Sequence, residues 1–420
     1  MPTPALKLAA VAALAVGLPA VPGTAQEPRR PSGRYRVGAL ELTPRLLLKN
    51  AGVDTNVFQT LQDPVRDEVV VFGPRLDGVL RVGRRLRATG TTYVDINYFH
   101  REGDERSTDF YGGGAASWTF PHFELFGGGG GGQFTQRFSI DVDERLKRQE
   151  KRAYAGATLR LAPRLDLTGQ WTGEVVTFAP AAFRLGGSVK EALDRNTLIG
   201  AGQIRYELTN RTRFVVSGEA LEDRFFSQPG PTPRTRRSYR GLAGFEVAES
   251  TFRRTPSGKL LFGVRDFPGT TEPGSPTYRG PVVLAGLAMP LGRLGLWRLD
   301  AERDVRFASS LVDLGSVRYR NAFVYERFQA EQQVALPLRV VGVWAGGFEQ
   351  ARYLLPYPYL SRSFLAHRVD HRWMGRLGLT RSFGRSMRLG GHVVWTRRVS
   401  SLPLFSYEGL TYGLTAEVTP

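Results

Sequence analysis

The chain has 420 residues, no cysteine and a mean hydropathy of −0.24, and its formal net charge is +18 at pH 7. Hydropathy this low excludes a bundle of membrane helices, and after the N-terminus no run of about 18 apolar residues could span a bilayer. The excess of 57 Lys and Arg over 39 Asp and Glu favours an anionic partner.

The N-terminus has the layout of a secretory signal. Lys7 precedes the apolar stretch 8–20, and the small-residue segment that follows reaches Ala25. This order predicts a signal peptide over residues 1–25 that is cleaved on export. The alternative is an N-terminal anchor, for which the apolar stretch is short. Because an exported chain rarely meets nucleic acid, the expected anionic partners are lipopolysaccharide of the outer-membrane lipid layer and anionic solutes, and not nucleic acid.

The segment after the signal, residues 26–42, is predicted to be a periplasmic lead-in or a short extra strand within "RYRVGALEL" (34–42). The tripeptide "TPR" (43–45) has the residues of a turn. We therefore expect the main domain to occupy residues 43–420, without a further domain boundary.

Long segments of this domain alternate between polar and apolar residues. In "RLDLTGQWTGEVV" (164–176), Asp166 and Glu174 share one parity, and Leu165 and Trp171 share the other. Since successive side chains of a strand point to opposite faces, the pattern predicts strands whose two faces meet different solvents. The same alternation recurs in the segments 295–307, 322–335 and 410–419.

A soluble β-sandwich would also alternate, but three features favour a membrane barrel. The segments run about 12–17 residues, whereas soluble strands usually have about 5–6. Short connections with Pro, Gly or Asn alternate with long, charged ones. Aromatic residues near the ends of the apolar faces, typical of membrane-interface girdles, are Trp171, Phe178, Trp297, Phe307, Tyr353, Trp373, Trp395 and Tyr412.

The connections give the strand count. Nine long loops accompany eight short turns, whose centres lie near residues 84, 121, 163, 209, 256, 291, 337 and 384. The chain is therefore predicted to be all-β, a transmembrane antiparallel β-barrel of about 18 strands (16–18) with short periplasmic turns and long outer loops. Closure is required because an open sheet edge leaves backbone groups unpaired in hydrocarbon. The loop 180–194 contains "KEALD" and could form a short helix.

One charged residue breaks the apolar parity of the segment 295–307. Arg303 stands between Ala301 and Val305 on that face. At the middle of a bilayer it would cost about 2–4 kcal/mol. We therefore expect it near an interface, where its stem could reach the lipid head groups.

No motif predicts catalysis, a metal site or a cofactor. The six glycines at 127–132 lack a following Gly-Lys-Ser/Thr and a helix pattern, so they predict a strand with room for a neighbour or a bend rather than a phosphate loop. His367 and His371 would suit zinc on a helix, but on a strand they stand about 13 Å apart. No Ser and His pair has a suggestive spacing, so we do not expect an enzyme.

Charged residues on the polar parity are the candidate functional residues. Rings of such side chains select permeating ions and polyions, and barrels of about 16–18 strands usually enclose an aqueous channel. The alternative role is cross-strand ion pairing that stiffens the barrel. The candidates for the lumen lining are Asp166, Glu174, Arg298, Asp300, Glu302, Asp304, Arg306, Arg327, Glu331, Arg372 and Arg376.

The segment "ELTPRLLLKNAGVDTNVF" (41–58) combines a Thr-Pro pair, an apolar strand and the pattern Gly-x-Asp-x-Asn-x-Phe. It resembles the opening of a family of outer-membrane beta-barrel porins whose members often accompany machinery for exopolysaccharide or capsule secretion. The resemblance covers under a twentieth of the chain. It implies an outer-membrane barrel with polysaccharide secretion machinery as a partner, and no catalytic residues. The matching residues are Thr43, Pro44, Gly52, Asp54, Asn56 and Phe58.

Together these features predict a porin-like channel in the outer membrane of a Gram-negative-type bacterium. It would pass anionic solutes or an acidic exopolysaccharide through a charged aqueous lumen. Two alternatives stay open. One is a plugged structural or adhesive barrel that binds a surface polymer, and the other is an outer-membrane barrel enzyme.

Overall fold

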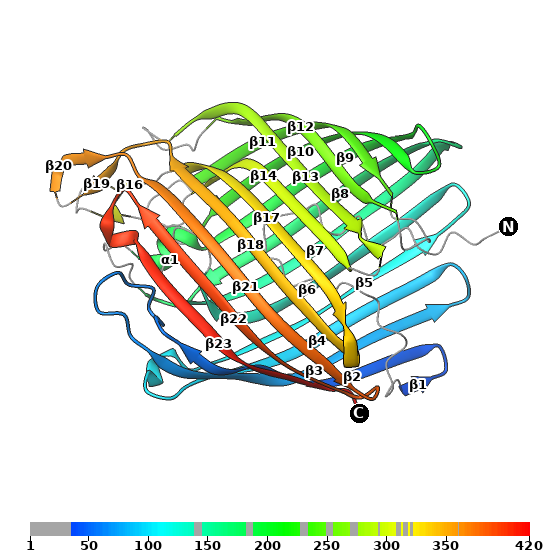
Figure 1. Ribbon diagram of the computed structural model, residues 1–420. Helices are drawn as coiled ribbons and strands as arrows, with labels where there is room; N and C mark the ends of the chain where they lie inside the picture. The colour runs from blue at the N-terminus through cyan, green and yellow to red at the C-terminus, as the bar shows by residue number, and fades with distance from the viewer. Residues whose placement is uncertain are drawn as a thin grey trace.

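The chain folds into one closed antiparallel β-barrel (Figure 1). The predicted signal peptide and most of the predicted lead-in lie outside the described residues. The computed structural model describes residues 35–137, 145–181, 188–226, 234–248, 255–268, 276–292, 295–307, 312–313, 318–319, 322–359 and 361–420.

Eighteen strands of 11–17 residues form the barrel, and each pairs with its neighbour along the chain. The first of them, β2, also pairs with the last, β23, which closes the sheet. Both the closure and the count confirm the prediction. The strands are β2 (Leu40–Asp54), β3 (Asp67–Val82), β4 (Leu86–Phe99), β5 (Ser107–Thr119), β6 (Phe123–Gln136), β7 (Leu146–Ala162), β8 (Leu165–Phe178), β9 (Arg195–Glu207), β10 (Thr212–Phe225), β11 (Arg234–Val247), β12 (Ser257–Phe267), β13 (Tyr278–Pro290), β14 (Leu296–Phe307), β17 (Ala322–Leu336), β18 (Val340–Tyr353), β21 (Val369–Phe383), β22 (Met387–Ser400) and β23 (Tyr407–Val418).

Shorter elements precede the barrel or lie in its connections. No helix in the described part of the chain is long and apolar enough to cross a membrane. The short elements are β1 (Tyr35–Val37), η1 (Gly103–Glu105), α1 (Val189–Leu193), β15 (Val312–Asp313), β16 (Arg318–Tyr319), η3 (Pro337–Arg339), β19 (Tyr357–Tyr359), β20 (Ser361–Ala366) and η4 (Pro403–Phe405).

An ion pair between distant strands identifies the inner face of the sheet. Arg240 on β11 lies with Nη1 2.9 Å from Oδ2 of Asp304 on β14, across the two intervening strands β12 and β13. Neighbouring strands are about 4.8 Å apart, so these two strands are about 14 Å apart along the sheet. Side chains bridge that separation only on the concave side, where they converge. Residues of this parity therefore face inward, and the alternate residues face outward.

The outward parity carries exposed large apolar side chains around the barrel. Their exposed fractions reach 59% at Trp171, 54% at Phe262 and 65% at Leu414. A soluble protein rarely exposes contiguous apolar surface of this extent. A transmembrane barrel requires such an apolar outer surface, because its outward side chains contact the hydrocarbon chains of the lipid.

Three of the aromatic residues predicted for the apolar face have their rings on the inner side. The ring of Phe307, at the end of β14, lies 4.0 Å from the Phe267 ring and 3.6 Å from the Arg236 guanidinium, both on the inward parity.

Phe178 and Tyr353 are 3% and 5% exposed, and both are on the inward parity. Phe178 packs against α1, and the ring of Tyr353 lies 4.5 Å from the Arg368 guanidinium. The prediction was wrong at these positions because it rested on the aromatic character of residues near strand ends, whereas Phe178 shares the inward parity of Asp166 and Glu174.

The start of the barrel also differs from the expected turn at residues 43–45. These residues lie inside β2, and the turn comes earlier, at Gly38 between β1 and β2, where φ is +59°. Leu46 is the first residue of β2 that pairs with β23, so Pro44 pairs with β3 alone. A proline is tolerated where the strand lacks one neighbour, because no ladder hydrogen bond is lost there.

The glycine run 127–132 lies in β6 and makes room for tyrosine rings. A Cβ atom on Gly130 would stand 2.8 Å from the Tyr111 hydroxyl oxygen, and one on Gly128 would stand 2.9 Å from the Tyr154 hydroxyl oxygen. Both tyrosines are on the inward parity. The glycines thus let two aromatic rings lie flat against the inner wall, which confirms the prediction of a strand with room for a neighbour.

Candidate functional site

The inner wall holds the residues that the sequence proposed for the lumen. Residues that pair across neighbouring strands lie on the same face of the sheet. The pairings from strand to strand place each of these residues on the same face as Arg240 and Asp304. The residues at these inward positions are Asp166 and Glu174 on β8, Arg298, Asp300, Glu302, Asp304 and Arg306 on β14, Arg327 and Glu331 on β17, and Arg372 and Arg376 on β21.

Asp304 is the centre of a first ion-pair network, which joins four strands. Its carboxylate lies 2.6 Å from Nε of Arg265 and 2.9 Å from Nη1 of Arg240. Glu219 completes the group, 2.7 Å from Arg240 and 3.6 Å from Arg265. All four side chains are at most 15% exposed. Two arginines and two carboxylates balance, so this part of the wall is polar without a net charge.

A second network surrounds Glu302. Its carboxylate lies 2.8 Å from Nη2 of Arg306 on the same strand and 3.2 Å from Nη2 of Arg327 on β17. The three residues are predicted lumen residues that the fold brings together. One carboxylate forms ion pairs with two guanidiniums, so these three side chains carry one net positive charge.

Arg306 extends this network toward β18 and β21. Its guanidinium lies 3.7 Å from the centre of the Tyr325 ring, and the Tyr325 hydroxyl donates to Glu349 at 2.8 Å. Glu349 in turn forms an ion pair with Arg372.

The sequence did not single out Tyr325 or Glu349, because only the register brings them to the predicted residues. Tyr325 stands opposite Asp304 on β14. Glu349 stands opposite Arg327 on β17 and Arg372 on β21.

The other predicted lumen residues have looser partners. Arg298 lies 3.6 Å from Glu331, and Asp166 lies 3.8 Å from Arg160. Among the described residues, no ion pair within 4.0 Å involves the remaining three, which are Glu174, Asp300 and Arg376. The wall therefore combines tightly paired charges, which stiffen it, with a few charges open to solvent.

Exposed arginines that form no ion pair with the described residues gather at the short-turn end of the barrel. They lie in or beside four of the predicted short turns, those centred near residues 84, 163, 337 and 384. We call this group the basic rim: Arg84 and Arg85 between β3 and β4, Arg164 between β7 and β8, Arg339 between β17 and β18, and Arg385 between β21 and β22.

The loop that could form a helix does so, and it packs on the inner wall. In α1, the buried side chains of Val189 and Leu193 pack against Phe178 of β8. Arg234 of β11 donates from Nη2 to the carbonyl oxygen of Ala192 at 2.9 Å. Because these partners are on the inward parity, α1 narrows the lumen near its long-loop end.

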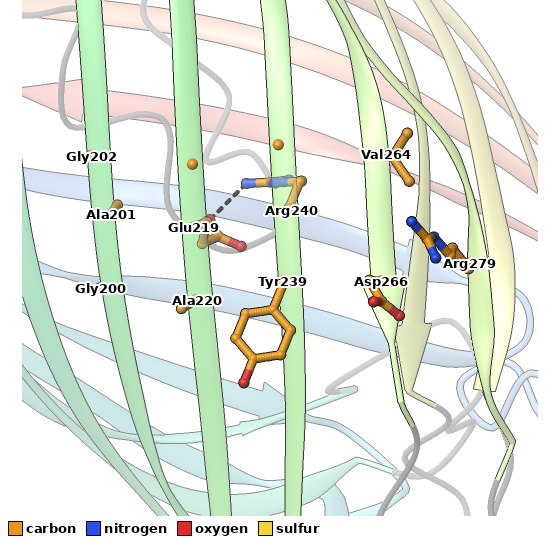
Figure 2. Close-up of a pocket in the computed structure, with 12 residues that line it drawn as sticks. Gly200, Ala201, Gly202, Glu219, Ala220, Tyr239, Arg240, Val264, Asp266 and Arg279 are labelled. Atoms are coloured by element: carbon orange, nitrogen blue, oxygen red, sulfur yellow. Dashed lines mark hydrogen bonds and ion pairs between the residues drawn. The ribbon is translucent and has the colours of Figure 1, made fainter.

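The outer wall has an open depression over β9–β13, framed by Tyr239, Asp266 and Arg279 (Figure 2). Its floor is made of outward-facing glycines and Ala220, and a Cβ atom on Gly218 would meet no atom within 4 Å. The Glu219–Arg240 ion pair seen beside it belongs to the inner face (Figure 2). The depression thus arises because the outward positions on its floor carry no bulky side chains, and it is not an entrance to the lumen.

The histidines that were weighed as metal ligands have other neighbours. The His371 ring stacks with Phe348 at 5.9 Å and with Trp373 at 5.9 Å, and the His367 carbonyl oxygen accepts from the Ser401 hydroxyl. Within the described ranges, no three His, Cys, Asp or Glu residues are placed to hold a metal ion.

The fold of this chain is similar to that of a solved porin, and further solved chains match it at lower scores. A BenF-like porin from Pseudomonas fluorescens Pf-5 is similar at a TM-score of 0.51 and 8% identity, covering 90% of this chain and 99% of that chain. OccK1 (OpdK) of Pseudomonas aeruginosa has a TM-score of 0.48 at 14% identity and coverages of 90% and 98%. OccAB3 of Acinetobacter baumannii has a TM-score of 0.47 at 13% identity and coverages of 90% and 99%. No family model and no curated protein matches the sequence, so the resemblance found at residues 41–58 stays a prediction.

Proposed function

We propose that the protein is a passive channel of the outer membrane of a Gram-negative-type bacterium, and not an enzyme. The observation that carries this proposal is the contrast between the two faces of one closed barrel. The outer wall exposes large apolar side chains, whereas the inner wall presents paired and unpaired charges. A cylinder of about 18 strands with such walls suits a water-filled passage through lipid.

Anionic solutes or an acidic exopolysaccharide are the permeants that the charges favour. The first network of the inner wall is neutral, whereas the group around Glu302 and the basic rim are positive. Positive charge at the entrance of a channel raises the local concentration of anions there. For an acidic polymer, the resemblance at residues 41–58 supports export together with polysaccharide secretion machinery.

A plugged or adhesive barrel is the second candidate function. It is favoured by α1, which occupies part of the inner wall and is anchored there by an apolar cluster and by Arg234. In that case the long loops would bind a surface polymer, and the lumen would conduct little.

Selectivity in planar bilayers tests the choice of permeant. Under a potassium chloride gradient, the reversal potential of the wild type is expected to show a preference for chloride. The variant Arg84→Glu, Arg85→Glu, Arg339→Glu and Arg385→Glu is expected to lose or invert that preference, because the mouth becomes negative. Arg298→Glu with Arg327→Glu tests the inner wall in the same way.

A control on the outer wall is Arg352→Gln, which removes one charge there and should leave the reversal potential unchanged. A preference for potassium that neither charge reversal alters would contradict anion selectivity. Absence of current, with binding of polymer by the folded barrel, would favour the adhesive function.

A further inference from the structure

The outer wall carries two clusters in which one glutamate holds two arginines. In the first, Glu222 on β10 lies 2.5 Å from Nε of Arg224 and 2.9 Å from Nε of Arg237 on β11. These residues share the outward parity of the exposed apolar wall. Both arginine side chains are 58% exposed, so their remaining N–H groups face the surroundings of the barrel.

The second cluster has the same composition on other strands. Glu326 on β17 lies 2.6 Å from Nη1 of Arg303 on β14 and 3.0 Å from Nη2 of Arg352 on β18. Arg303 is the residue that broke the apolar parity of its strand, and Glu326 is its direct partner in the register. Two guanidiniums thus share one carboxylate in each cluster, which leaves each with one net positive charge.

Both clusters lie at a similar depth near the long-loop end of the barrel. Glu222 is three residues from the end of β10, and Glu326 is four residues from the start of β17. That corresponds to about 10–13 Å along a strand. An arginine on the lipid face costs about 2–4 kcal/mol at the bilayer midplane and about 0–1 kcal/mol near an interface. Both clusters therefore belong at head-group level.

The arrangement of each cluster suits a phosphate group. A guanidinium has five N–H donors, and each of these four arginines uses one nitrogen for its glutamate. The shared carboxylate keeps both guanidiniums within ion-pair distance of one group, so less side-chain entropy is lost on binding. Guanidiniums with free N–H pairs bind phosphate oxygens in the bidentate manner, which a lone ammonium group cannot do.

We propose that each cluster binds a phosphate group carried by a lipid in the leaflet at the long-loop end of the barrel. The proposal rests on the membrane location given under Proposed function and names the lipid chemistry that the outer wall recognises. The depression of Figure 2 is a weaker candidate, since the outward-facing arginine that borders it, Arg279, stands directly opposite Asp266 in the register.

Lipid binding to the folded barrel tests the proposal. The full mature chain in detergent would be titrated with lipopolysaccharide or with phosphatidylglycerol, and bound lipid counted by native mass spectrometry. The variant Arg224→Gln, Arg237→Gln, Arg303→Gln and Arg352→Gln is expected to bind at least about tenfold more weakly than wild type. Removing one cluster alone should abolish one of two tight sites.

The matched control is Arg84→Gln, Arg85→Gln, Arg339→Gln and Arg385→Gln, which removes the same charge from the basic rim and should bind lipid as wild type does. Binding of both lipids supports a general lipid-phosphate site, and binding of lipopolysaccharide alone supports the phosphorylated glycolipid as the source. Equal binding by the outer-wall variant, or an equal loss in the control, would overturn the proposal. Folding is checked by the heat-induced shift in electrophoretic mobility, so failure of the channel function would leave this result interpretable.

Discussion

Replacing Asp304 with alanine is expected to lower the free energy of unfolding of the barrel by about 3–5 kcal/mol. The change leaves Arg240 and Arg265 on the inner wall, at 15% and 11% exposure, without the carboxylate that links β11 and β12 to β14. Glu219 alone would then face two guanidiniums. Urea unfolding in lipid vesicles, followed by tryptophan fluorescence, measures the difference.

Asp300→Ala is the matched control for this prediction. Asp300 is on the same strand and face, but it is exposed and forms no ion pair within the described part of the chain. Its removal should change the free energy of unfolding by less than about 0.5 kcal/mol, as surface substitutions usually do. Equal effects of the two changes would show that the Asp304 network does not stabilise the barrel.

Replacing Asp370 with alanine is expected to have a comparable effect for a related reason. Its carboxylate lies 2.9 Å from Nη2 of Arg368 and 2.6 Å from Nη2 of Arg398, and all three side chains are at most 1% exposed. The Arg368 guanidinium also lies 3.4 Å from the Phe405 ring in the last long loop. Loss of the carboxylate leaves two buried guanidiniums without this partner, which should cost about 3–5 kcal/mol.

The same change should loosen the last long loop, because Arg368 holds Phe405. Hydrogen exchange of residues 401–406 in the folded state measures this local effect separately from global stability. Asp95→Ala is the control, since its partner Lys49 is 41% exposed and such a pair is worth about 0–1 kcal/mol. Unchanged exchange in Asp370→Ala would argue against the anchoring role.

The number of strands and the two faces of the sheet could be predicted because their causes are local. Alternation within 164–176 or 295–307 depends on adjacent residues, and short turns depend on a few residues with known backbone preferences. The inward positions of residues such as Arg306 and Arg327 follow from the same parity.

The partners of those residues could not be predicted. The Arg240–Asp304 contact requires both the register of four strands and the curvature that brings non-neighbouring strands together. Arg303 looked like an isolated charge until the register placed Glu326 opposite it.

Phe178 was assigned to the lipid face because it is aromatic, although it shares the parity of Asp166 and Glu174. Its contact with α1 could not be predicted, because it depends on how the long loop folds back.

The closed barrel is expected to enclose a continuous aqueous path. Single-channel recording of the refolded barrel in planar bilayers tests for this path, with folding verified beforehand by the heat-induced mobility shift. Discrete current steps are expected, and their size should rise in proportion to the salt concentration. A fully folded barrel that inserts into the bilayer and yields no current steps would contradict this expectation.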